Sequence, residues 1–390
     1  MDERVLAERL ISYDTSTPDG IRAAAGFVKG WMESVEIDVA ADEYNGLPFL
    51  TAEIGAAGGP VVVVHGHIAV VPGHPEQLEP RVEGDRLIGR GAYDMKGGLA
   101  GIMCALRDLR EMSLSPPVRV KFICAPDEES EDIDLRSTDE MVSRGLVGDF
   151  AITGEPTDLH VGVQAKGVCM ARLVVGGRAA HGSTPWLGDN AVLKAIDVFR
   201  RIESLPFARE SSELFDRPSI NLGRLNGGDA VNKVPDEAIM AVDIRYLPGQ
   251  EPGAILEQIR SIPDVEIVRT FIRPPAFVSR TNPYVLALCE AVRRAGQREA
   301  MSVGRDGASD AISFIQAGIP AVEFGPAGGG HHGPDEWVSI SSLTRYREAL
   351  VDFIANLPAQ MSRTDVPLRA SGPRLIAVED RTSGGRGGLA

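Results

Sequence analysis

The sequence predicts an α/β fold in which a main domain has a mostly parallel sheet with helices on both faces, together with an inserted α+β domain. Short apolar strands alternate with amphipathic helices over residues 1–165, and such alternation implies crossover connections between parallel strands. Between residues 166 and 273, half-exposed strands alternate with two amphipathic helices, which is typical of a small α+β sandwich. The length of 390 residues also favours more than one domain. We therefore expect a main domain of residues 1–165 and 274–358, interrupted by an inserted domain of residues 166–273.

Apolar spacing assigns the individual elements. In the main domain, the expected elements are helices at 4–12, 20–35, 99–112, 282–294, 309–317 and 341–357, and strands at 50–54, 60–64, 118–125, 150–153 and 319–324. The inserted domain is expected to hold strands at 167–175 and 237–246 and helices at 190–202 and 253–262. The segment 359–390 is rich in glycine, arginine and serine, and we expect it to be a disordered tail.

Composition argues against several classes of protein. With 55 acidic and 40 basic residues, the formal net charge is −15, so we expect neither a nucleic-acid partner nor an anionic membrane surface. Four widely separated cysteines without a CxxC pair indicate buried thiols in a reducing compartment. The charged start of the chain and the lack of a long apolar run predict a cytoplasmic protein. No GxSxG elbow, phosphate-binding glycine loop or Rossmann fingerprint supports a serine hydrolase or a nucleotide-dependent enzyme.

Imidazoles and carboxylates gather at the predicted ends of the main-domain strands. A four-valine run delivers His67 to the carboxyl edge of the sheet, and Asp94 lies just before a Gly-Gly pair where a helix begins. The other candidates follow strands or lie in a glycine-rich segment: Glu128, Glu129, Glu155, His331 and His332. This donor set suits zinc, with manganese or cobalt as chemical neighbours, and a bridging aspartate would allow two ions. Because neighbouring extended residues point in opposite directions, one of the paired glutamates can bind metal while the other serves as base.

Eight motifs in order carry a family resemblance: H-x-x-x-V-P, GRGAxDMKGG, DEE, GEPT, HGSTP, N-K-V-P, D-I-R and H-x-x-D-E. Over residues 1–357 the chain resembles the co-catalytic zinc aminopeptidase/deacylase family, whose members include acetylornithine deacetylase, succinyl-diaminopimelate desuccinylase, aminoacylase and carboxypeptidase G. The resemblance implies two zinc ions per chain, with His67 and Glu155 on one, Glu129 and His332 on the other, and Asp94 as the bridge. It makes Glu128 the general base. His332 is preferred because it begins the H-x-x-D-E spacing, whereas His65, His74, His160 and His331 are expected to be structural or surface residues.

The inserted domain resembles the lid and dimerisation domain of that family. His181, in AAHGSTP, matches a histidine that stabilises the oxyanion, commonly in the site of a partner subunit, and this implies a homodimer. Asn232, in AVNKVP, and Arg245, in DIRY, match positions that hold substrate carbonyl and carboxylate groups. A guanidinium suits that role because it can bind both oxygens of a carboxylate. For Arg305, in VGRDGASDA, contact with the substrate side chain and pairing with Asp306 remain equal alternatives.

One position departs from the family pattern. The family has an aspartate two residues after the first histidine ligand, whereas this chain has Ala69 after His67. Loss of such a supporting carboxylate typically costs about 10–100-fold in metal affinity or activity. The alanine is compatible with an engineered change, with a natural loss in a binding homologue, or with compensation by another acid, for which Asp127 and Glu76 are the nearby candidates.

These observations lead to a functional expectation with one alternative. The resemblance implies hydrolysis of an amide bond in a small N-acyl amino acid or short peptide, by a dinuclear zinc enzyme that Ala69 impairs. The alternative is a catalytically silent homologue that binds an amino-acid-like ligand.

Overall fold

The computed structural model describes residues 1–112, 118–130, 136–296 and 302–357, so the predicted tail at 359–390 lies outside the described residues. The chain divides into two compact units. Unit 1 comprises Met1–Ala165 and the described residues from Ala276 onward, and unit 2 comprises Lys166–Pro275. Among the described helices, none combines the length and the apolar character that a membrane crossing requires.

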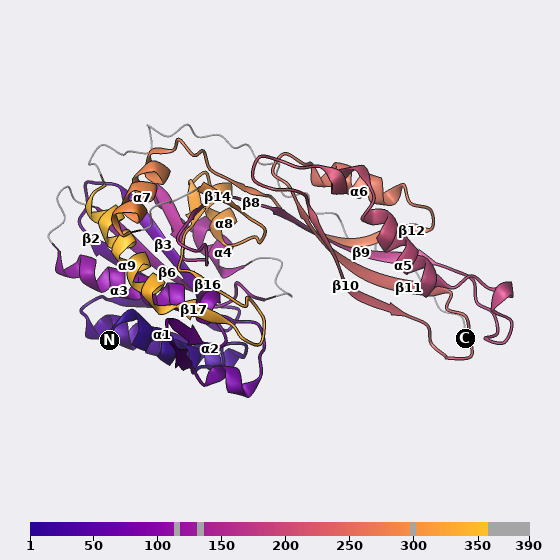
Figure 1. Cartoon of the computed structure of the whole chain (residues 1–390), viewed down its shortest axis with the longest axis horizontal. Helices are drawn as coiled ribbons and strands as arrows, with labels where there is room; N and C mark the ends of the chain where they lie inside the picture. Colours follow the sequence, from indigo (N-terminus) through magenta and orange to yellow (C-terminus); the bar gives the residue numbers. More distant parts are fainter. Residues whose placement is uncertain (113–117, 131–135, 297–301, 358–390) are drawn as a thin grey trace. The chain divides into compact units, whose positions relative to one another are not determined.

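Unit 1 is built on a mixed sheet whose centre is parallel (Figure 1). Within the described residues, the strand order is β1-β2-β6-β3-β7-β15-β8-β13, and β14 also pairs with β8. The central strands β6, β3, β7 and β15 run parallel, whereas β1 and β2 form an antiparallel edge. The strands are β1 (Val39–Tyr44), β2 (Leu47–Gly55), β3 (Val61–His67), β6 (Arg119–Ala125), β7 (Phe150–Thr153), β8 (Val161–Ala165), β13 (Ala276–Phe277), β14 (Ser302–Arg305) and β15 (Ala321–Glu323).

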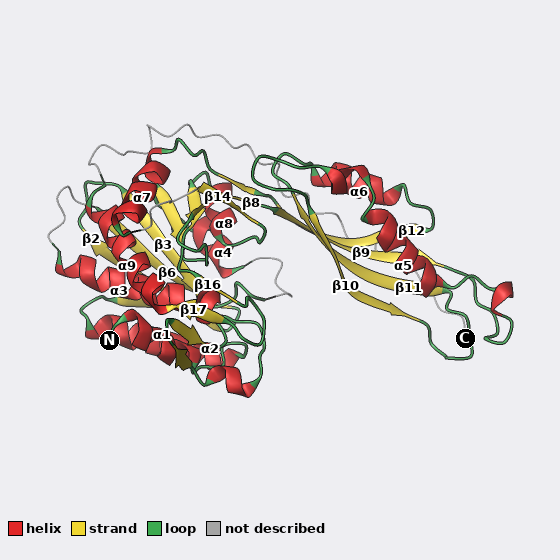
Figure 2. Ribbon diagram, in the orientation of Figure 1, coloured by secondary structure: helices red, strands yellow, loops and turns green. Residues whose placement is uncertain are grey.

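Helices cover both faces of this sheet (Figure 2). On one face, Val63 of β3 packs in a cluster with Met141 of α4 and Phe314 of α8. On the other face, Gly66 of β3 lies against Leu99 of α3. The helix α3 in turn packs on α1 and α9. The helices are α1 (Glu3–Ile11), α2 (Pro18–Ser34), α3 (Gly97–Glu111), α4 (Ser137–Ser143), α7 (Pro283–Arg294), α8 (Ala311–Gln316) and α9 (Ile340–Ala355). Several begin where a polar side chain accepts a main-chain N–H, as at Asp2, Thr17, Asn282 and Ser339.

A second, small sheet in unit 1 joins two segments that are far apart in the sequence. Its strands β4 (Arg81–Glu83), β5 (Arg86–Ile88), β16 (Gly328–Gly329) and β17 (Trp337–Ser339) follow the antiparallel order β16-β17-β5-β4. The pairing of β17 with β5 sets Trp337 opposite Ile88. The short helical turn η1 (Pro75–Leu78) precedes this sheet, and the wider turn η2 (Ala92–Lys96) follows β5 and leads into α3. The segments that carry Asp94 and the His331–His332 pair are therefore fixed beside each other.

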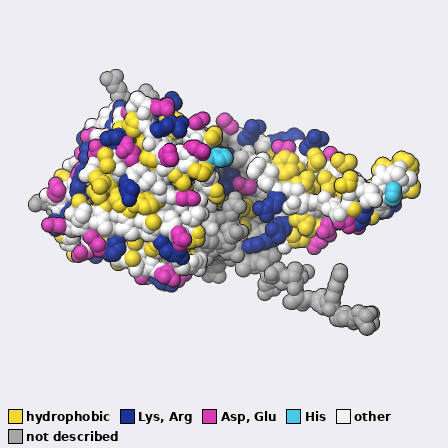
Figure 3. Space-filling view, turned by 90° about the horizontal axis from the view of Figure 1, so that it is seen from below, with side chains coloured by type: hydrophobic (Ala, Val, Ile, Leu, Met, Phe, Trp, Pro, Cys, Tyr) yellow, Lys and Arg dark blue, Asp and Glu magenta, His cyan; other side chains and the backbone are white. Residues whose placement is uncertain are grey.

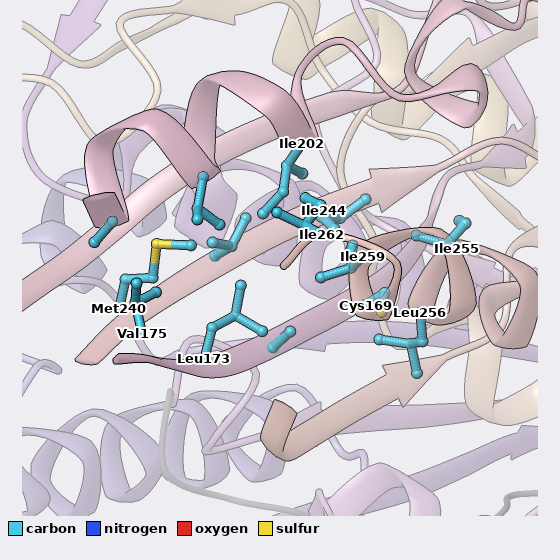
Figure 4. Packing of buried hydrophobic residues seen from close by; sticks show 14 of the residues in the cluster. Cys169, Leu173, Val175, Ile202, Met240, Ile244, Ile255, Leu256, Ile259 and Ile262 are labelled. Atoms are coloured by element: carbon cyan, nitrogen blue, oxygen red, sulfur yellow. The ribbon is translucent and has the colours of Figure 1, made fainter. Parts of the chain in front are cut away.

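Unit 2 is an α+β sandwich. Its sheet has the antiparallel order β10-β11-β9-β12, and α5 and α6 pack on one face. Figure 4 shows the core between them, where Leu173, Met240, Ile202 and Ile259 interdigitate. The elements are β9 (Gly167–Gly176), η3 (Pro185–Leu187), α5 (Ala191–Ile202), η4 (Pro206–Arg209), β10 (Ser219–Gly227), β11 (Glu237–Tyr246), α6 (Pro252–Arg260) and β12 (Val265–Arg273).

The predicted fold class is confirmed, but the element list was incomplete. The sequence predicted only two strands in the inserted segment, and β10 and β12 were missed. Both are outer strands of the sheet, and almost all of their side chains are exposed or only half-buried, so their apolar residues give a weaker signal than those of β9 and β11. On the face shown in Figure 3, acidic and basic side chains are interspersed over unit 1.

Candidate metal centre

The carboxyl ends of three neighbouring parallel strands meet at one edge of the main sheet. His67 is the last residue of β3 and lies opposite Ala125, the last residue of β6, while Thr153 ends β7 opposite His65. Glu128 and Glu129 follow β6, and Glu155 follows β7. This parallel register explains why residues from separate stretches of sequence gather at a single place.

Asp94 faces this edge from the turn η2, which leads into α3. Its Oδ1 atom lies 3.2 Å from His67 Nε2, and Glu155 Oε1 lies 3.7 Å from the same nitrogen. His67, Asp94 and Glu155 are all buried. The glycines around Asp94 allow the close approach: a Cβ on Gly91, whose φ is +78°, would lie 2.6 Å from Val70, and one on Gly98 would lie 2.3 Å from the carbonyl oxygen of Gly154.

The second carboxylate oxygen of Asp94 faces a different set of groups. Asp94 Oδ2 lies 2.5 Å from His331 Nε2 and 3.3 Å from His332 Nε2, and His332 Nε2 lies 3.0 Å from Glu129 Oε1. A carboxylate whose two oxygens face two separate donor groups is arranged as a bridge between two cations. Three groups of residues could each hold a metal ion, because within each group the possible ligand atoms lie within 4.8 Å of one another. The groups are Asp94, His331 and His332; His67, Glu128 and Glu129; and His67, Asp94 and Glu155.

The sequence did not anticipate the position of His331. Both histidines of the pair approach Asp94, so the preference for His332 over His331 stays a prediction. The imidazole of His331 also stands edge-on to the ring of Tyr93, with ring centroids 6.0 Å apart. His331 and His332 lie in a glycine-rich loop, which has no periodicity from which the direction of their side chains could be inferred. The H-x-x-D-E spacing was the only local evidence for choosing between the two histidines.

The carboxylates and imidazoles perturb one another strongly. Burial favours a raised pKa for Asp94, but hydrogen bonds with His331, His332 and His67 outweigh it and hold that pKa well below the usual range. Burial, with the charge of Asp94 added to it, raises the pKa of Glu155 well above normal. Burial opposes the charged form of His67, yet its hydrogen bond to Asp94 and the charge of Glu155 raise its pKa well above normal. Hydrogen bonds to Asp94 and Glu129 raise the pKa of His332 to about 10.

These residues fit divalent metal ions. The Oε1 atom of Glu155 is buried and has no hydrogen-bond partner within the described part of the chain. A buried carboxylate oxygen without a partner is costly unless a cation compensates it. The mixture of imidazole nitrogen and carboxylate oxygen donors matches zinc and its chemical neighbours.

Metal uptake at neutral pH is expected to release protons. With a pKa of about 10, His332 is protonated at pH 7 in the metal-free protein, whereas a metal ligand must be neutral imidazole. The raised pKa means that the charged form adds stability below the unfolded pKa of about 6.5, and this contribution is lost as pH rises through about 10. Metal affinity should therefore increase with pH over that range. Addition of zinc to lightly buffered protein with an indicator dye measures the release, and His332→Gln should release fewer protons; absence of release at pH 7 would contradict the assignment.

Glu128 makes a contact that the sequence did not reveal. Its carboxylate forms an ion pair with Arg136, whose Nη1 also lies 3.3 Å from Asp310 Oδ1. Asp310 is fully buried and accepts a hydrogen bond from Thr138 at 2.5 Å, and His65 Nε2 lies 3.2 Å from it. Burial opposes the charge of Arg136, but Glu128 and Asp310 outweigh it and raise the pKa of Arg136. No motif in the segment before Ser137 singles out this arginine.

The main chain at Ala69 supplies a contact to the first histidine. His67 Nδ1 lies 2.9 Å from the carbonyl oxygen of Ala69, which accepts a hydrogen bond if the imidazole carries its proton on Nδ1. That tautomer leaves Nε2 free to face Asp94 and a metal ion. The two acids considered as compensation do not take this place. Asp127 accepts hydrogen bonds from the N–H, at 2.9 Å, and the hydroxyl of Ser137, and Glu76 is exposed on η1.

The remaining candidates lie in unit 2 or beside the sheet. His181 is exposed and forms a hydrogen bond with Ser183 at 2.7 Å. The next residue, Gly182, donates its N–H to the carbonyl oxygen of Asn232 at 2.7 Å. His181 and Asn232 therefore lie at the same end of unit 2. Arg245 is not with them: it lies at the far end of β11 and pairs with Asp243 at 2.9 Å. Arg305 binds the buried Glu323 through Nε at 3.1 Å, a partner that neither sequence alternative named.

The fold and this cluster define a metallohydrolase of the α/β class. Residues 63–356 match the model of peptidase family M20/M25/M40, and the chain belongs to this family. The resemblance inferred from the motifs is thereby confirmed.

Relatives agree with this assignment, and solved structures share the fold. The chain is 27% identical to a succinyl-diaminopimelate desuccinylase from Gluconacetobacter diazotrophicus over 90% of this chain and 96% of the relative. It is 31% identical to a putative succinyl-diaminopimelate desuccinylase from Mycobacterium tuberculosis over 75% of this chain and 80% of the relative. A tripeptidase from Staphylococcus aureus has the same fold at 22% identity, with a TM-score of 0.75 over 90% of this chain and 96% of that chain. An M20 family metallo-carboxypeptidase from Sulfolobus solfataricus also has this fold, at 19% identity. Its TM-score is 0.74, and the match covers 91% of this chain and 99% of that chain.

Proposed function

We propose that this protein uses two divalent metal ions, with zinc as the first choice and cobalt or manganese as alternatives, to hydrolyse an amide bond in a small N-acyl amino acid or short peptide. The observation that carries the proposal is the position of Asp94, whose two oxygens face separate donor groups beside Glu128. His67 and Glu155 would hold one ion, and Glu129 with His332 or His331 the other. Relatives named as a desuccinylase and a tripeptidase support amide hydrolysis as the reaction.

The bound ions would lower the pKa of a water molecule and polarise the acyl carbonyl. Glu128 would take a proton from the attacking water and return it to the leaving amine; its burial beside His67 and Glu129 supports this role. His181 would stabilise the negative oxygen that develops on the substrate. Asn232 would bind a substrate carbonyl, and Arg245 a carboxylate, for which it would have to share its guanidinium with Asp243.

A hydrolysis assay tests this proposal. Metal-free protein, protein with added zinc, and protein with added cobalt or manganese are incubated with acetyl, succinyl and dipeptide substrates. Amine release that depends on added metal is the expected result. If two ions are bound and no substrate in the panel is cleaved, the proposed activity is wrong.

Two observations favour a second candidate, a catalytically silent homologue that binds an amino-acid-like ligand. Ala69 provides no supporting carboxylate. The carboxylate of Glu128, which would act as base, forms an ion pair with Arg136. Metal content does not separate the two candidates, since a silent homologue would keep its ligands. Binding of N-acyl amino acids to the metal-loaded protein without any turnover is the result that would favour this candidate.

Replacing Ala69 with aspartate is expected to raise kcat at least ~10-fold and to leave KM nearly unchanged. The restored carboxylate would act on the nucleophile side of the site and not on the bound substrate. Metal content should not change, because the main-chain carbonyl already contacts His67. Steady-state kinetics measure the effect, and Ala69→Asn is the control of matched size without the charge. If Ala69→Asp leaves turnover at zero with both metals bound, the silent homologue becomes the better account.

A homodimer formed through unit 2 is expected if His181 acts in the site of a partner subunit. Analytical ultracentrifugation of the full chain should then give a mass near twice 41.7 kDa. A dimer should be needed for activity, so dilution below the dimerisation constant should reduce specific activity. A strictly monomeric particle with full activity would remove His181 from a role across subunits.

The cytoplasmic location and the lack of nucleic-acid and membrane partners remain predictions from composition.

A further inference from the structure

Two loops that carry candidate metal ligands are joined by a buried ion pair. Glu336 Oε1 accepts the main-chain N–H groups of Tyr93 and Asp94, each at 3.0 Å. Glu336 Oε2 accepts from Arg90 Nη1 at 2.7 Å, and Arg90 Nη2 donates to the carbonyl oxygen of His332 at 3.1 Å. One carboxylate and one guanidinium thus bind the segment of Asp94 to the segment of His332. The two segments are 238 residues apart in the sequence.

The ion pair is shielded from water. Arg90 is 4% exposed and Glu336 is 1% exposed, so neither charge is screened by solvent as a surface pair would be. Breaking a buried pair by removing one partner leaves an uncompensated charge, which is costly. The pair is therefore a rigid connection and differs from the exposed ion pairs elsewhere on unit 1.

Main-chain bonds extend the connection on both sides. Gly89 N–H donates to the carbonyl oxygen of Glu336 at 2.9 Å, next to the pairing of β5 with β17. Gln77 Nε2 donates to the carbonyl oxygens of Gly333 and Pro334 at 3.0 and 3.1 Å. The loop after His332 is consequently held from several directions, with the ion pair nearest to the metal ligands.

The adjacent acid in the same motif does something different. Asp335 is 85% exposed and pairs with Arg81 only at 3.6 Å, on the surface. Of the two acids in His-Gly-Pro-Asp-Glu, Glu336 binds the segment that carries Asp94 and Asp335 points to the surface, a distinction that the motif alone does not make. Asp335 is thus an internal control for the charge of the segment.

We propose that Arg90 and Glu336 form a clamp that sets the separation between Asp94 and the His331–His332 pair, and so positions ligands of both metal ions. This inference rests on the proposed metal-dependent function. Neither residue is a ligand. The clamp acts through the main chain: Glu336 holds the N–H of Asp94, and Arg90 holds the carbonyl of His332.

Two conservative substitutions would weaken the clamp without removing much side-chain volume. Glu336→Gln keeps an oxygen for the N–H groups of Tyr93 and Asp94 but sets an amide nitrogen, a donor, against the donor Nη1 of Arg90. Arg90→Lys keeps the positive charge but cannot reach Glu336 and the His332 carbonyl with a planar fork. Both variants keep most of the buried volume, and both should disturb ligand positions more than they disturb packing.

Cobalt titration of the full chain tests the clamp without reference to activity. The visible absorption of bound Co²⁺ reports ligand geometry, and the titration gives affinity. We expect Glu336→Gln and Arg90→Lys to weaken metal affinity by about 10–100-fold and to shift the cobalt spectrum, with Asp335→Asn behaving as the unaltered protein. An unchanged spectrum and affinity in both clamp variants would overturn the proposal, and so would the same change in Asp335→Asn.

Thermal unfolding separates positioning from folding. Lower melting temperatures are expected for both clamp variants, because each leaves a buried charge without its full partner. If both variants are already unfolded at the temperature of the cobalt titration, where Asp335→Asn is folded, the pair is structural and the proposed positioning role is wrong. The outcome is distinguishable from failure of the proposed function. Unaltered protein that binds cobalt but cleaves no substrate would contradict the activity alone, whereas unaltered protein that binds no metal would contradict both.

Discussion

Replacing Glu128 with glutamine is expected to lower kcat by about 10²–10⁴-fold while both metal ions stay bound. Glutamine has nearly the same shape but cannot accept the proton of the attacking water. Glu128 lies within the same 4.8 Å group as His67 and Glu129, although the proposal assigns it no metal. KM should change little, because Glu128 is not assigned a contact with the substrate. Steady-state kinetics and metal analysis of the same preparation measure the two parts of this prediction.

Two controls sharpen the test of Glu128. Glu76→Gln removes an exposed acid of unit 1 and should leave kcat unchanged. Arg136→Gln frees Glu128 from its ion pair and shows whether that pair restrains or supports the base. If Glu128→Gln retains ordinary turnover, the base lies elsewhere, and the loss of metal in this variant would instead make Glu128 a ligand.

Replacing Asp94 with alanine is expected to disturb both metal sites, so that bound metal falls from about two ions per chain toward none. Asp94 Oδ1 faces His67 and its Oδ2 faces His331 and His332, so removal of this one carboxylate takes a ligand from each group. Glu155→Ala should mainly disturb one site, because Glu155 belongs to the group of His67 and Asp94. Elemental analysis after dialysis against dilute zinc gives the stoichiometry.

Single replacements of the two histidines complete this test. His331→Ala and His332→Ala should differ in the metal that they retain, and the one that lowers occupancy more is the ligand. A single metal site that Asp94→Ala leaves unaffected would show that the two-metal interpretation is wrong.

The central strands of the main sheet could be predicted because their signals are local. The valine run of β3 and the residues after β6 and β7 identified a shared edge of the sheet, and the observed register of His67 with Ala125 is the parallel arrangement that this argument required. Outer strands such as β10 were missed since few of their side chains are fully buried. Family motifs added His181, Asn232 and Arg245, whose roles stay predictions.

Contacts between distant segments could not be predicted from local pattern. Arg136 pairs with Glu128 and Asp310 across three separate segments, and no spacing rule encodes such a meeting. The same holds for Glu336, whose side chain binds main-chain groups near residue 94. The contact between the main-chain carbonyl of Ala69 and the imidazole of His67 could not be predicted from the identity of the side chain at position 69. In the family pattern, an aspartate at that position would support the same imidazole.

The clamp between Arg90 and Glu336 has a consequence for the order in which the protein matures. His67, Asp94, Glu129 and Glu155 are all synthesised within the first 165 residues, whereas the histidine pair and Glu336 follow only after the whole of unit 2. Closing so long a stretch of chain carries an entropic cost that only the docked segment repays. A nascent chain can therefore assemble the group of His67, Asp94 and Glu155 early, but it acquires the second group only when the end of unit 1 is released from the ribosome. We therefore expect the second group to take up metal only at the last stage of folding of unit 1.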